Sequence, residues 1–406
     1  MGRQPVNKQT LEDIEVTGKR VLVRVDFNVP IEEQGVDKLP QYDQRIRASI
    51  PTIQYLLDHN AKVVLCSHLG RPDGRVVEGL RMAPIAARLE ALLGRPVKHV
   101  QDCIGPETEK AVAALEPGEV LLLENLRFYP GETANDPMFA RALASLADIF
   151  VMDAFAVAHR AHASTVGVPQ HLPSVAGFLL AREMEVVGNV LGHPERPMGA
   201  LLGGAKVSDK VQVLENLLPR ISVLLIGGGM GATFLKALGL PTGRSQIEED
   251  LLETAARVRH QALAKGITFH IPRDVVVARE FEPNAQALGV FSVEEVPEDS
   301  YIMDIGPHTV EIYVRNLQRC RTILWNGPVG VFEFPAFAEG TTKLARAMAN
   351  LDATTIVGGG STAEVVEELG LADRFTHVST GGGASLELLG GKELPGIAAL
   401  ANKGGM

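Results

Sequence analysis

The sequence predicts an α/β fold with parallel β-sheets, because two patterns alternate along the chain. The first is a series of short segments that are almost continuously apolar and rich in Val, Ile and Leu, as is typical of strands buried on both faces of a parallel sheet. The second is a set of helical patterns between these segments, with apolar residues three and four positions apart. Such alternation indicates βαβ units.

The expected strands fall into two groups along the chain. Those in the first half are 19–27, 61–69, 119–126 and 147–155. Those in the second half are 198–206, 221–230, 267–278, 301–307, 322–330, 354–362 and 375–385. Clear helical patterns occupy residues 80–94, which end in a glycine, and residues 248–266, whose acidic start and basic end suit the helix dipole.

A chain of 406 residues exceeds one ordinary hydrophobic core, so two domains are expected. Residues 178–197 have the pattern of one long helix ended by glycine and proline, which would join two α/β halves. We therefore expect two doubly wound, Rossmann-like domains joined by a long helix. The expected boundaries are an N-terminal domain 1–178, the helix 179–197, a C-terminal domain 198–389, and a tail 390–406 that packs back towards the N-terminal domain.

Composition and charge exclude several classes of protein. The 39 basic and 49 acidic residues give a net charge of −10, which argues against a general nucleic-acid-binding face. Cys66, Cys103 and Cys320 form neither a metal-binding spacing nor a disulfide framework, which favours a reducing compartment. The N-terminus lacks the apolar core of a signal peptide, and Val6 breaks the myristoylation pattern. We expect a cytoplasmic protein without nucleic-acid or membrane partners.

Charged and polar side chains follow the expected strands of the first half. Because the carboxyl ends of parallel strands meet at one edge of a sheet, they should converge there. Arginine binds phosphate and carboxylate through two parallel hydrogen bonds, so this edge is expected to bind a small, strongly anionic metabolite. The residues concerned are Arg24, Asp26, Asn28, Arg45, His68, Arg71, Arg127, His159, Arg160 and His162.

Glycine follows the expected strands of the second half, in the segments 203–210, 227–231, 326–330, 358–362 and 381–385. Glycine lets the backbone approach a phosphate closely, and the amides at the start of a following helix can donate hydrogen bonds to it. One half therefore looks suited to an anionic metabolite and the other to a nucleotide. This pairing is expected of a phosphoryl-transfer enzyme.

Simpler interpretations and other functions remain open at this point. A single glycine triplet is most often a tight turn, a single arginine is most often solvated, and Asp26 could simply pair with Arg24. The P-loop pattern is absent. The segment GGGMGA, residues 227–232, matches the dinucleotide fingerprint, with Glu248 and Glu249 at a suitable distance, so a NAD-dependent oxidoreductase is one alternative. A non-catalytic nucleotide-binding protein is another.

The chain resembles the phosphoglycerate kinase family along essentially its whole length. The motifs that carry the resemblance, in family order and at compatible spacing, are RVDFNVP, SHLGRP, ENLRF, AHRAHAS, GGAKVSDK, GGGM, WNGPVGVFE and STGGGAS. The resemblance implies reversible phosphoryl transfer between 1,3-bisphosphoglycerate with ADP and 3-phosphoglycerate with ATP, in glycolysis or gluconeogenesis. It implies Mg²⁺ as cofactor, a monomer, small-molecule substrates alone, and domain closure about the connecting helix.

The resemblance also implies the site residues. The N-terminal domain would bind 3-phosphoglycerate through Asp26, Phe27, Asn28, Arg45, His68, Leu69, Gly70, Arg71, Arg127 and Arg160. The C-terminal domain would bind the nucleotide through Gly204, Ala205, Lys206, Lys210, Gly227, Gly228, Gly229, Gly327, Val331, Glu333, Gly358, Gly359, Gly360 and Ser361. The catalytic residues would be Arg45, Lys206, Gly382 and Gly383.

The chemistry of the reaction supports the same emphasis on positive charge. The accepting carboxylate is already ionised at neutral pH, so catalysis depends on alignment and on stabilising the charge of the moving phosphoryl group. Lys206 is our first choice for this role, with Arg45 on the other side of the phosphoryl group. Lys210 would share a helix face with Lys206 if a helix began there. Glu333 would accept hydrogen bonds from the ribose hydroxyls.

The expected metal site departs from the family pattern. The residue after the glycine triplet is normally an aspartate that reaches the magnesium, and here it is Ser361. A neutral hydroxyl binds Mg²⁺ more weakly than a carboxylate. We therefore expect Ser361 to be a weak ligand at most and to cap the following helix, with the metal held chiefly by the nucleotide phosphates and water.

Overall fold

The computed structural model describes residues 7–404, and the chain divides into two compact units. One unit extends to Glu185 and takes in the chain again from Glu393, and the other runs Val186–Lys392. The expectations about residues 1–6, including the missing signal peptide and Val6, lie outside the described residues. Among the residues described, no helix is long and apolar enough to cross a membrane.

The first unit contains a fully parallel six-stranded sheet, in the order β3-β4-β2-β1-β5-β6. The chain winds from β1 in both directions, so the topological switch point lies between β1 and β5. In such sheets the ligand site lies at the carboxyl ends of the strands beside this point. The strands are β1 (Arg20–Arg24), β2 (Lys62–Cys66), β3 (Val97–His99), β4 (Val120–Leu122), β5 (Ile149–Met152) and β6 (Ser174–Ala176).

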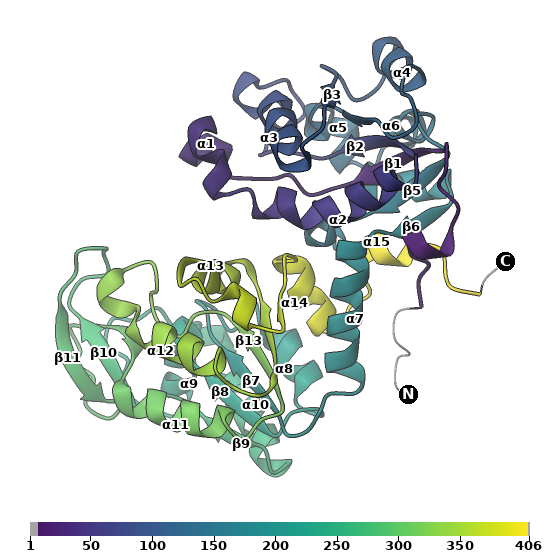
Figure 1. Cartoon of the computed structure of the whole chain (residues 1–406). Helices are drawn as coiled ribbons and strands as arrows, with labels where there is room; N and C mark the ends of the chain where they lie inside the picture. Colours follow the sequence, from purple (N-terminus) through teal and green to yellow (C-terminus); the bar gives the residue numbers. More distant parts are fainter. Residues whose placement is uncertain (1–6, 405–406) are drawn as a thin grey trace. The chain divides into compact units, whose positions relative to one another are not determined.

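Helices cover this sheet (Figure 1). They are α1 (Ile31–Gln34), α2 (Gln44–Asp58), α3 (Ala83–Leu93), α4 (Pro106–Ala113), α5 (Pro130–Thr133), α6 (Pro137–Ala144), α15 (Pro395–Ala398) and the first part of α7 (Phe178–Gly192). The apolar stripes of α2 and α3, including Ile53 and Leu89, pack on Val21 and Val63 of the central strands. Because both faces of the central strands are buried, their sequences are continuously apolar.

The second unit repeats this design with a second parallel six-stranded sheet, in the order β15-β14-β13-β7-β8-β9. Its switch point lies between β7 and β13, where glycine follows both strands. The strands are β7 (Met198–Leu202), β8 (Val223–Ile226), β9 (Thr268–His270), β13 (Thr322–Asn326), β14 (Thr354–Gly358) and β15 (His377–Val378).

Alternate side chains of these strands serve two separate cores. Ala200 and Leu224 pack with α8, α9 and α10, whereas Leu201 and Trp325 pack with α11, α12 and α13. The sheet is therefore covered on both faces, as a doubly wound fold requires. The helices are α8 (Val211–Leu217), α9 (Gly228–Ala237), α10 (Leu252–Ala264), α11 (Pro307–Leu317), α12 (Glu339–Met348), α13 (Gly360–Glu368) and α14 (Gly383–Leu389).

A small antiparallel sheet corrects one part of the sequence prediction. The expected strand 267–278 is two strands, β9 and β10 (Asp274–Ala278), and β10 pairs antiparallel with β11 (Ala287–Ser292) and β12 (Tyr301–Ile305). The expectation that 301–307 belongs to a parallel sheet is therefore wrong. β3, β6 and β11 were not predicted, because two of them have only three residues and β11 is largely exposed.

The last segment of the chain completes the first unit. Ala401 donates a backbone hydrogen bond of 2.9 Å to Ser174 at the start of β6, and Lys8 forms a β-bridge with Asn402. Gly396, in α15, donates to the carbonyl of Ala158 at 2.8 Å. Residues from both ends of the described chain thus lie at the β6 edge of the same sheet.

Candidate active site

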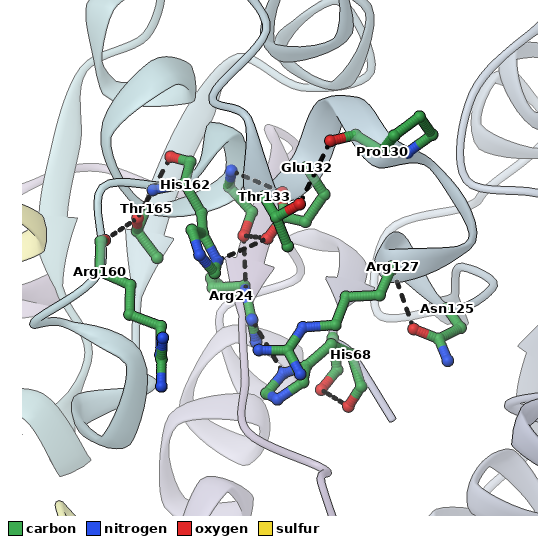
Figure 2. A network of polar contacts seen from close by, with 12 residues as sticks. Arg24, His68, Asn125, Arg127, Pro130, Glu132, Thr133, Arg160, His162 and Thr165 are labelled. Carbon is green, nitrogen blue, oxygen red and sulfur yellow. Dashed lines mark hydrogen bonds and ion pairs between the residues drawn. The ribbon is translucent and has the colours of Figure 1, made fainter. Parts of the chain in front are cut away.

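Arg24 lies at the carboxyl end of β1 and is 1% exposed. Its guanidinium group donates to Ser164 Oγ at 2.8 Å, to the carbonyl of Val25 at 2.5 Å and to His68 Nδ1 at 3.1 Å (Figure 2). Ser164 in turn donates from Oγ and from its backbone amide to the buried carboxylate of Glu132, at 2.6 Å and 3.0 Å. Arg24 is therefore held in place by a buried polar chain.

This contact assigns the proton of His68. Arginine has only donors, so Nδ1 of His68 must accept, and the ring proton resides on Nε2. Burial lowers the pKa of His68 well below its usual value, and the positive charges of Arg24, Arg127 and Arg45 lower it further. His68 is therefore a neutral hydrogen-bond donor at neutral pH.

Arg127 and Arg160 point towards the same region from the segments after β4 and β5 (Figure 2). Arg127 donates to the carbonyl of Gly70 at 2.8 Å, while its Nε is buried without a hydrogen-bond partner. Burial and repulsion by Arg24 and Arg160 lower the pKa of Arg127 to about 10. Positive charge is concentrated here, and an anionic ligand would relieve the repulsion among these arginines.

His162 belongs to the same cluster. It is 8% exposed, and its Nδ1 has no hydrogen-bond partner, although the Glu132 carboxylate is 3.8 Å away. Burial lowers the pKa of His162 to about 4, with Arg127, Arg24 and Arg160 adding to the shift. His162 is therefore neutral at neutral pH, and the arginines supply the positive charge.

The remaining predicted metabolite-binding residues surround this cluster. The guanidinium group of Arg45 forms an ion pair with the carboxylate of Asp26. The side-chain oxygen of Asn28 accepts a hydrogen bond of 2.8 Å from the amide of Gly70. Asp26 thus pairs with Arg45 and not with Arg24, the partner that the simpler interpretation of Asp26 named. The amide of Phe27 donates to Ser67 Oγ at 2.9 Å, and the amide of Leu69 donates to Asn125 at 3.2 Å. Both amides therefore have partners within the protein.

Arg71 is exposed, and its positive charge is one of those that lower the pKa of Arg127. Glu132 and Ser164 were missed by the sequence prediction, although Ser164 lies within the AHRAHAS motif. A buried carboxylate gives no local sequence pattern, so only its contacts identify it. We refer to Arg24, Arg45, His68, Arg71, Arg127, Arg160 and His162 as the cation cluster.

In the second unit, the glycine-rich segments after β7, β8 and β13 pack against one another. Gly228 has φ +63° and donates to the carbonyl of Val329, and Gly327 has φ +95°. A Cβ on Gly228 would lie 2.7 Å from the Gly204 nitrogen, and one on Gly327 would lie 2.4 Å from the Gly203 carbonyl carbon. These glycines are required by backbone packing, whatever ligand binds. Gly229 is likewise crowded by the backbone of Ala205, whereas Gly227 is crowded chiefly by the side chain of Val329.

Other glycines leave open space that a ligand could approach. A Cβ on Gly204, Gly360 or Gly382 would meet no atom within 4 Å. In the segment 381–385, the amides of Gly381 and Ala384 already donate within the protein, to Ser379 Oγ and to the Gly381 carbonyl. The predicted pair Gly382 and Gly383 is thus the part of this segment whose amides can serve a ligand.

The two predicted lysines lie before α8 in different environments. Lys206 is exposed, and Lys210 is 7% exposed at the N-cap of α8, which begins at Val211. The expectation that both share one helix face is therefore wrong. Burial lowers the pKa of Lys210, and Asp209 partly offsets this effect. The carboxylate of Glu248 accepts from the amides of Val207 and Ser208, at 2.5 Å and 3.2 Å, and so anchors the turn beside Lys206.

A cavity of about 510 Å³ brings Glu333 and Ser361 together. Pro328, Phe332, Val365 and Leu369 supply apolar lining, and Glu333, Glu364 and Glu368 supply carboxylates. This mixture suits a nucleoside, which has a flat base and a polar sugar. Predicted Val331 is half-buried, next to the lining residue Phe332. A depression of about 550 Å³ between α8 and α10 contains none of the predicted residues.

Asn326, at the carboxyl end of β13, was missed by the sequence prediction. It is fully buried, and neither its oxygen nor its nitrogen has a hydrogen-bond partner. A Cβ on Gly359 would lie 3.1 Å from the Asn326 nitrogen, so the side chain adjoins the predicted segment Gly358–Gly360. A buried amide without partners is costly, which makes Asn326 a candidate ligand contact. The WNGPVG motif contained it.

The described residues do not form a metal site of their own. Within residues 7–404, no group of three His, Cys, Asp or Glu side chains could hold a metal ion. Ser361 is exposed and is the second residue of α13, whose N-cap is Gly359, so the expected capping role of Ser361 is wrong. A single neutral hydroxyl does not fit a protein-held Mg²⁺.

The two doubly wound sheets, one with a cation cluster and the other with glycine-lined strand ends and a nucleoside-sized cavity, define a nucleotide-dependent phosphotransferase. The sequence pattern of the phosphoglycerate kinase family matches residues 11–392. The chain belongs to the phosphoglycerate kinase family.

Relatives and solved structures cover nearly the whole chain. It is similar to the phosphoglycerate kinase of Moorella thermoacetica, with 56% identity over 396 residues, 98% of this chain and 100% of the relative. The Dictyoglomus turgidum enzyme is 52% identical over 394 residues, 97% of this chain and 98% of the relative. Phosphoglycerate kinase structures from Coxiella burnetii and Pyrococcus horikoshii OT3 have TM-scores of 0.85 and 0.81 and identities of 40% and 32%, each covering 97% of this chain and 98% of theirs.

Membership fixes the reaction class. The chain is a phosphotransferase with a carboxyl group as acceptor. The family reaction, part of glycolysis, interconverts 1,3-bisphosphoglycerate plus ADP and 3-phosphoglycerate plus ATP. The dinucleotide-dependent oxidoreductase suggested by GGGMGA is therefore not the function of this chain. Glu248, which would have bound the ribose of a dinucleotide, accepts hydrogen bonds from the turn before α8 instead.

Proposed function

We propose that the cation cluster binds the phosphate and carboxylate of 3-phosphoglycerate, and that the second unit binds ATP or ADP. The observation that carries this proposal is the convergence of Arg24, Arg127 and Arg160 from the ends of three neighbouring segments, with the Nε of Arg127 buried and without a hydrogen-bond partner (Figure 2). Asp26, Asn28 and Gly70 line the same strand ends through their mutual contacts. An anion of two or three charges would neutralise the repulsion among these arginines.

In the second unit, the nucleoside would occupy the cavity lined by Phe332 and Glu333, with Glu333 accepting from the ribose hydroxyls. The phosphates would lie over the open backbone at Gly204 and Gly360, with Lys210 and Asn326 as further contacts. The glycines whose Cβ positions are blocked by backbone would hold these segments in place rather than bind the ligand.

The proposed step is a direct transfer without a general base. A carboxylate oxygen of 3-phosphoglycerate attacks the terminal phosphorus of ATP, the bond from that phosphorus to the oxygen of ADP breaks, and an acyl phosphate forms. Lys206 would stabilise the charge of the moving phosphoryl group, Arg45 would approach it from the metabolite side, and Gly382 and Gly383 would donate from their amides. His68, being neutral, would donate a hydrogen bond from Nε2 to the substrate and take no part in proton transfer.

We propose that Mg²⁺ accompanies the nucleotide and is held by its phosphates and by water, with Ser361 as a weak ligand at most. We also propose that the protein acts as a monomer in the cytoplasm. The three buried free cysteines are compatible with a reducing compartment. Size-exclusion chromatography with light scattering would test the monomer.

A coupled assay tests the site assignment. With ATP, Mg²⁺ and 3-phosphoglycerate, the protein should turn over, and Lys206→Ala should lower kcat at least about a hundredfold, because a charge-stabilising donor is lost. Lys236→Ala, which removes an exposed lysine at the end of α9, is the control and should stay within about twofold of the parent. Equal rates for the two variants would contradict the role of Lys206.

A further inference from the structure

Asp304 is a buried carboxylate that the proposed mechanism does not use. It lies in β12, is 2% exposed, and pairs with the apolar Val276 of β10. Its Oδ1 accepts from the amide of Ile305 at 2.8 Å, and its Oδ2 accepts from the amide of Gly340 at 2.7 Å. None of the ion pairs found among the described residues includes it. A buried charge without a salt bridge is costly, so the hydrogen bonds that Asp304 accepts must offset that cost.

Its contacts connect two walls of the nucleoside-sized cavity. Gly340 is the second residue of α12, and Ala338 and Thr342, two residues before and after it, line the cavity. On the other side, a Cβ on Gly330 would lie 2.2 Å from Asp304 Oδ1, so the carboxylate fits closely beneath the segment that carries Phe332 and Glu333. The amide of Val331 also donates to the carbonyl of Met303, the residue before Asp304, at 2.8 Å.

The geometry requires a carboxylate rather than an amide. Two N–H groups approach two different oxygens, and an asparagine would turn its NH₂ group towards one of them. That donor would lose its acceptor in a buried place, where an unpaired N–H is expensive. A negative charge here also suits the N-terminus of α12. Replacing or protonating the carboxylate of Asp304 should therefore weaken its hydrogen bond to Gly340 and shift the start of α12.

The charged groups that act on Asp304 come from α12. Burial raises the pKa of Asp304 to about 7, the hydrogen bonds from Gly340 and Ile305 oppose this shift, Glu339 adds to it and Lys343 opposes it. The carboxylate therefore gains a proton within the physiological pH range. Protonation removes negative charge from the N-terminus of α12 and weakens the acceptor that holds Gly340.

We propose that Asp304 is a positioning residue for the nucleotide site, which joins the segment carrying Glu333 to the N-terminus of α12 and so sets the shape of the nucleoside cavity. This inference rests on the proposed assignment of the nucleotide to that cavity. Asp304 does not touch the ligand. It acts through the backbone of residues 330–333 and 338–342.

The test measures the binding of adenosine, because its base and sugar do not titrate between pH 6 and 8, whereas nucleotide phosphates do. Asp304→Asn should raise the Kd for adenosine at pH 8 at least about fivefold. The matched control is Asp274→Asn, which removes a carboxylate that accepts from the amides of His308 and Thr309 at the start of α11, a helix that does not line the cavity. The control should change Kd less than about twofold.

Glu333→Gln separates this inference from the site assignment. If Glu333→Gln weakens adenosine binding and Asp304→Asn does not, the positioning role is wrong and the site stands. If neither variant changes the Kd, both the cavity assignment and the positioning role are wrong. If Asp304→Asn weakens binding no more than Asp274→Asn does, the effect is one of stability alone and the inference is overturned.

A second measurement needs no variant at Asp304 and decides the matter if Asp304→Asn fails to fold. In the parent protein, the Kd for adenosine should rise as the pH falls from 8 to 6, with a midpoint near the pKa of about 7. The same dependence should persist in Asp274→Asn. A Kd that stays constant across this range would overturn the inference.

Discussion

At the scale of single residues, His162 shows how the cation cluster changes an ionisable group. Its pKa is lowered from 6.5 to about 4 by burial and by three arginines. Between these pH values the unfolded chain binds a proton at His162 and the folded chain does not. Stability contributed by this group is therefore present above pH 6.5 and is lost as the pH falls towards 4.

A pair of variants measures this effect. The thermal midpoint should fall between pH 7 and pH 5 in the parent protein, and His162→Gln should reduce the fall. Asp304 contributes with the opposite sign, because its raised pKa makes its protonated form favourable in the folded state below about pH 7. The test is therefore the difference in pH dependence of the thermal midpoint between the parent protein and His162→Gln. His193→Gln, at an exposed histidine, should leave the parent curve unchanged.

Ser361 leads to a prediction about metal dependence. Ser361→Asp should lower the Mg²⁺ concentration needed for half-maximal rate, because a carboxylate binds this hard cation more strongly than a hydroxyl does. Ser361→Asn, which adds similar bulk without charge, should not. A coupled assay across Mg²⁺ concentrations at fixed ATP measures the difference. An unchanged requirement in Ser361→Asp would refute a metal-facing position for Ser361.

The sequence alone could predict those candidate site residues that directly follow a strand. Arg127 and Lys206 could be chosen because a buried strand fixes where its end must lie. Glu132 and Asp304 could not be chosen, since a buried acid is defined by tertiary contacts that leave no periodic pattern. For the same reason the sequence could not identify Arg45 as the partner of Asp26.

At the scale of elements, the turn before α8 depends on Glu248, which joins it from the start of the helical segment Glu249–Leu251. Glu248→Gln should lower kcat about tenfold with a smaller change in the KM for 3-phosphoglycerate, because the turn carries Lys206. The exposed neighbour Glu249 provides the control, and Glu249→Gln should retain parental kinetics. A purely structural effect would lower the thermal midpoint and leave kcat of the folded enzyme intact.

Element types were predictable where burial was uniform. The central strands of both sheets, and helices such as α3 and α10, follow from hydrophobic periodicity. β11 was not recognised, because Gly289 divides a short apolar segment whose Leu288 and Val290 are exposed, so its sequence does not show which side is buried. The long segment 267–278 was predicted as one strand, although Pro272 and Arg273 lie at the break between β9 and β10.

At the scale of the whole molecule, the proposed reaction has its two substrates in different units, and we predict that binding of both substrates closes the units on each other. We predict that the radius of gyration from small-angle X-ray scattering falls only when 3-phosphoglycerate and a nucleotide are both bound. Each ligand alone should leave the radius of gyration unchanged. A ternary complex with the same radius as the free protein would contradict this prediction.

The return of residues from Glu393 onwards to the first unit has a consequence for synthesis. While the polypeptide is still leaving the ribosome, the strand-edge contacts of Ser174 and Lys8 lack Ala401 and Asn402, which are translated after the whole second unit. The uninterrupted segment Val186–Lys392 can reach its native contacts earlier. The unit translated first is thus the last to be finished, and prematurely terminated chains would expose the unpaired edge to proteases and chaperones.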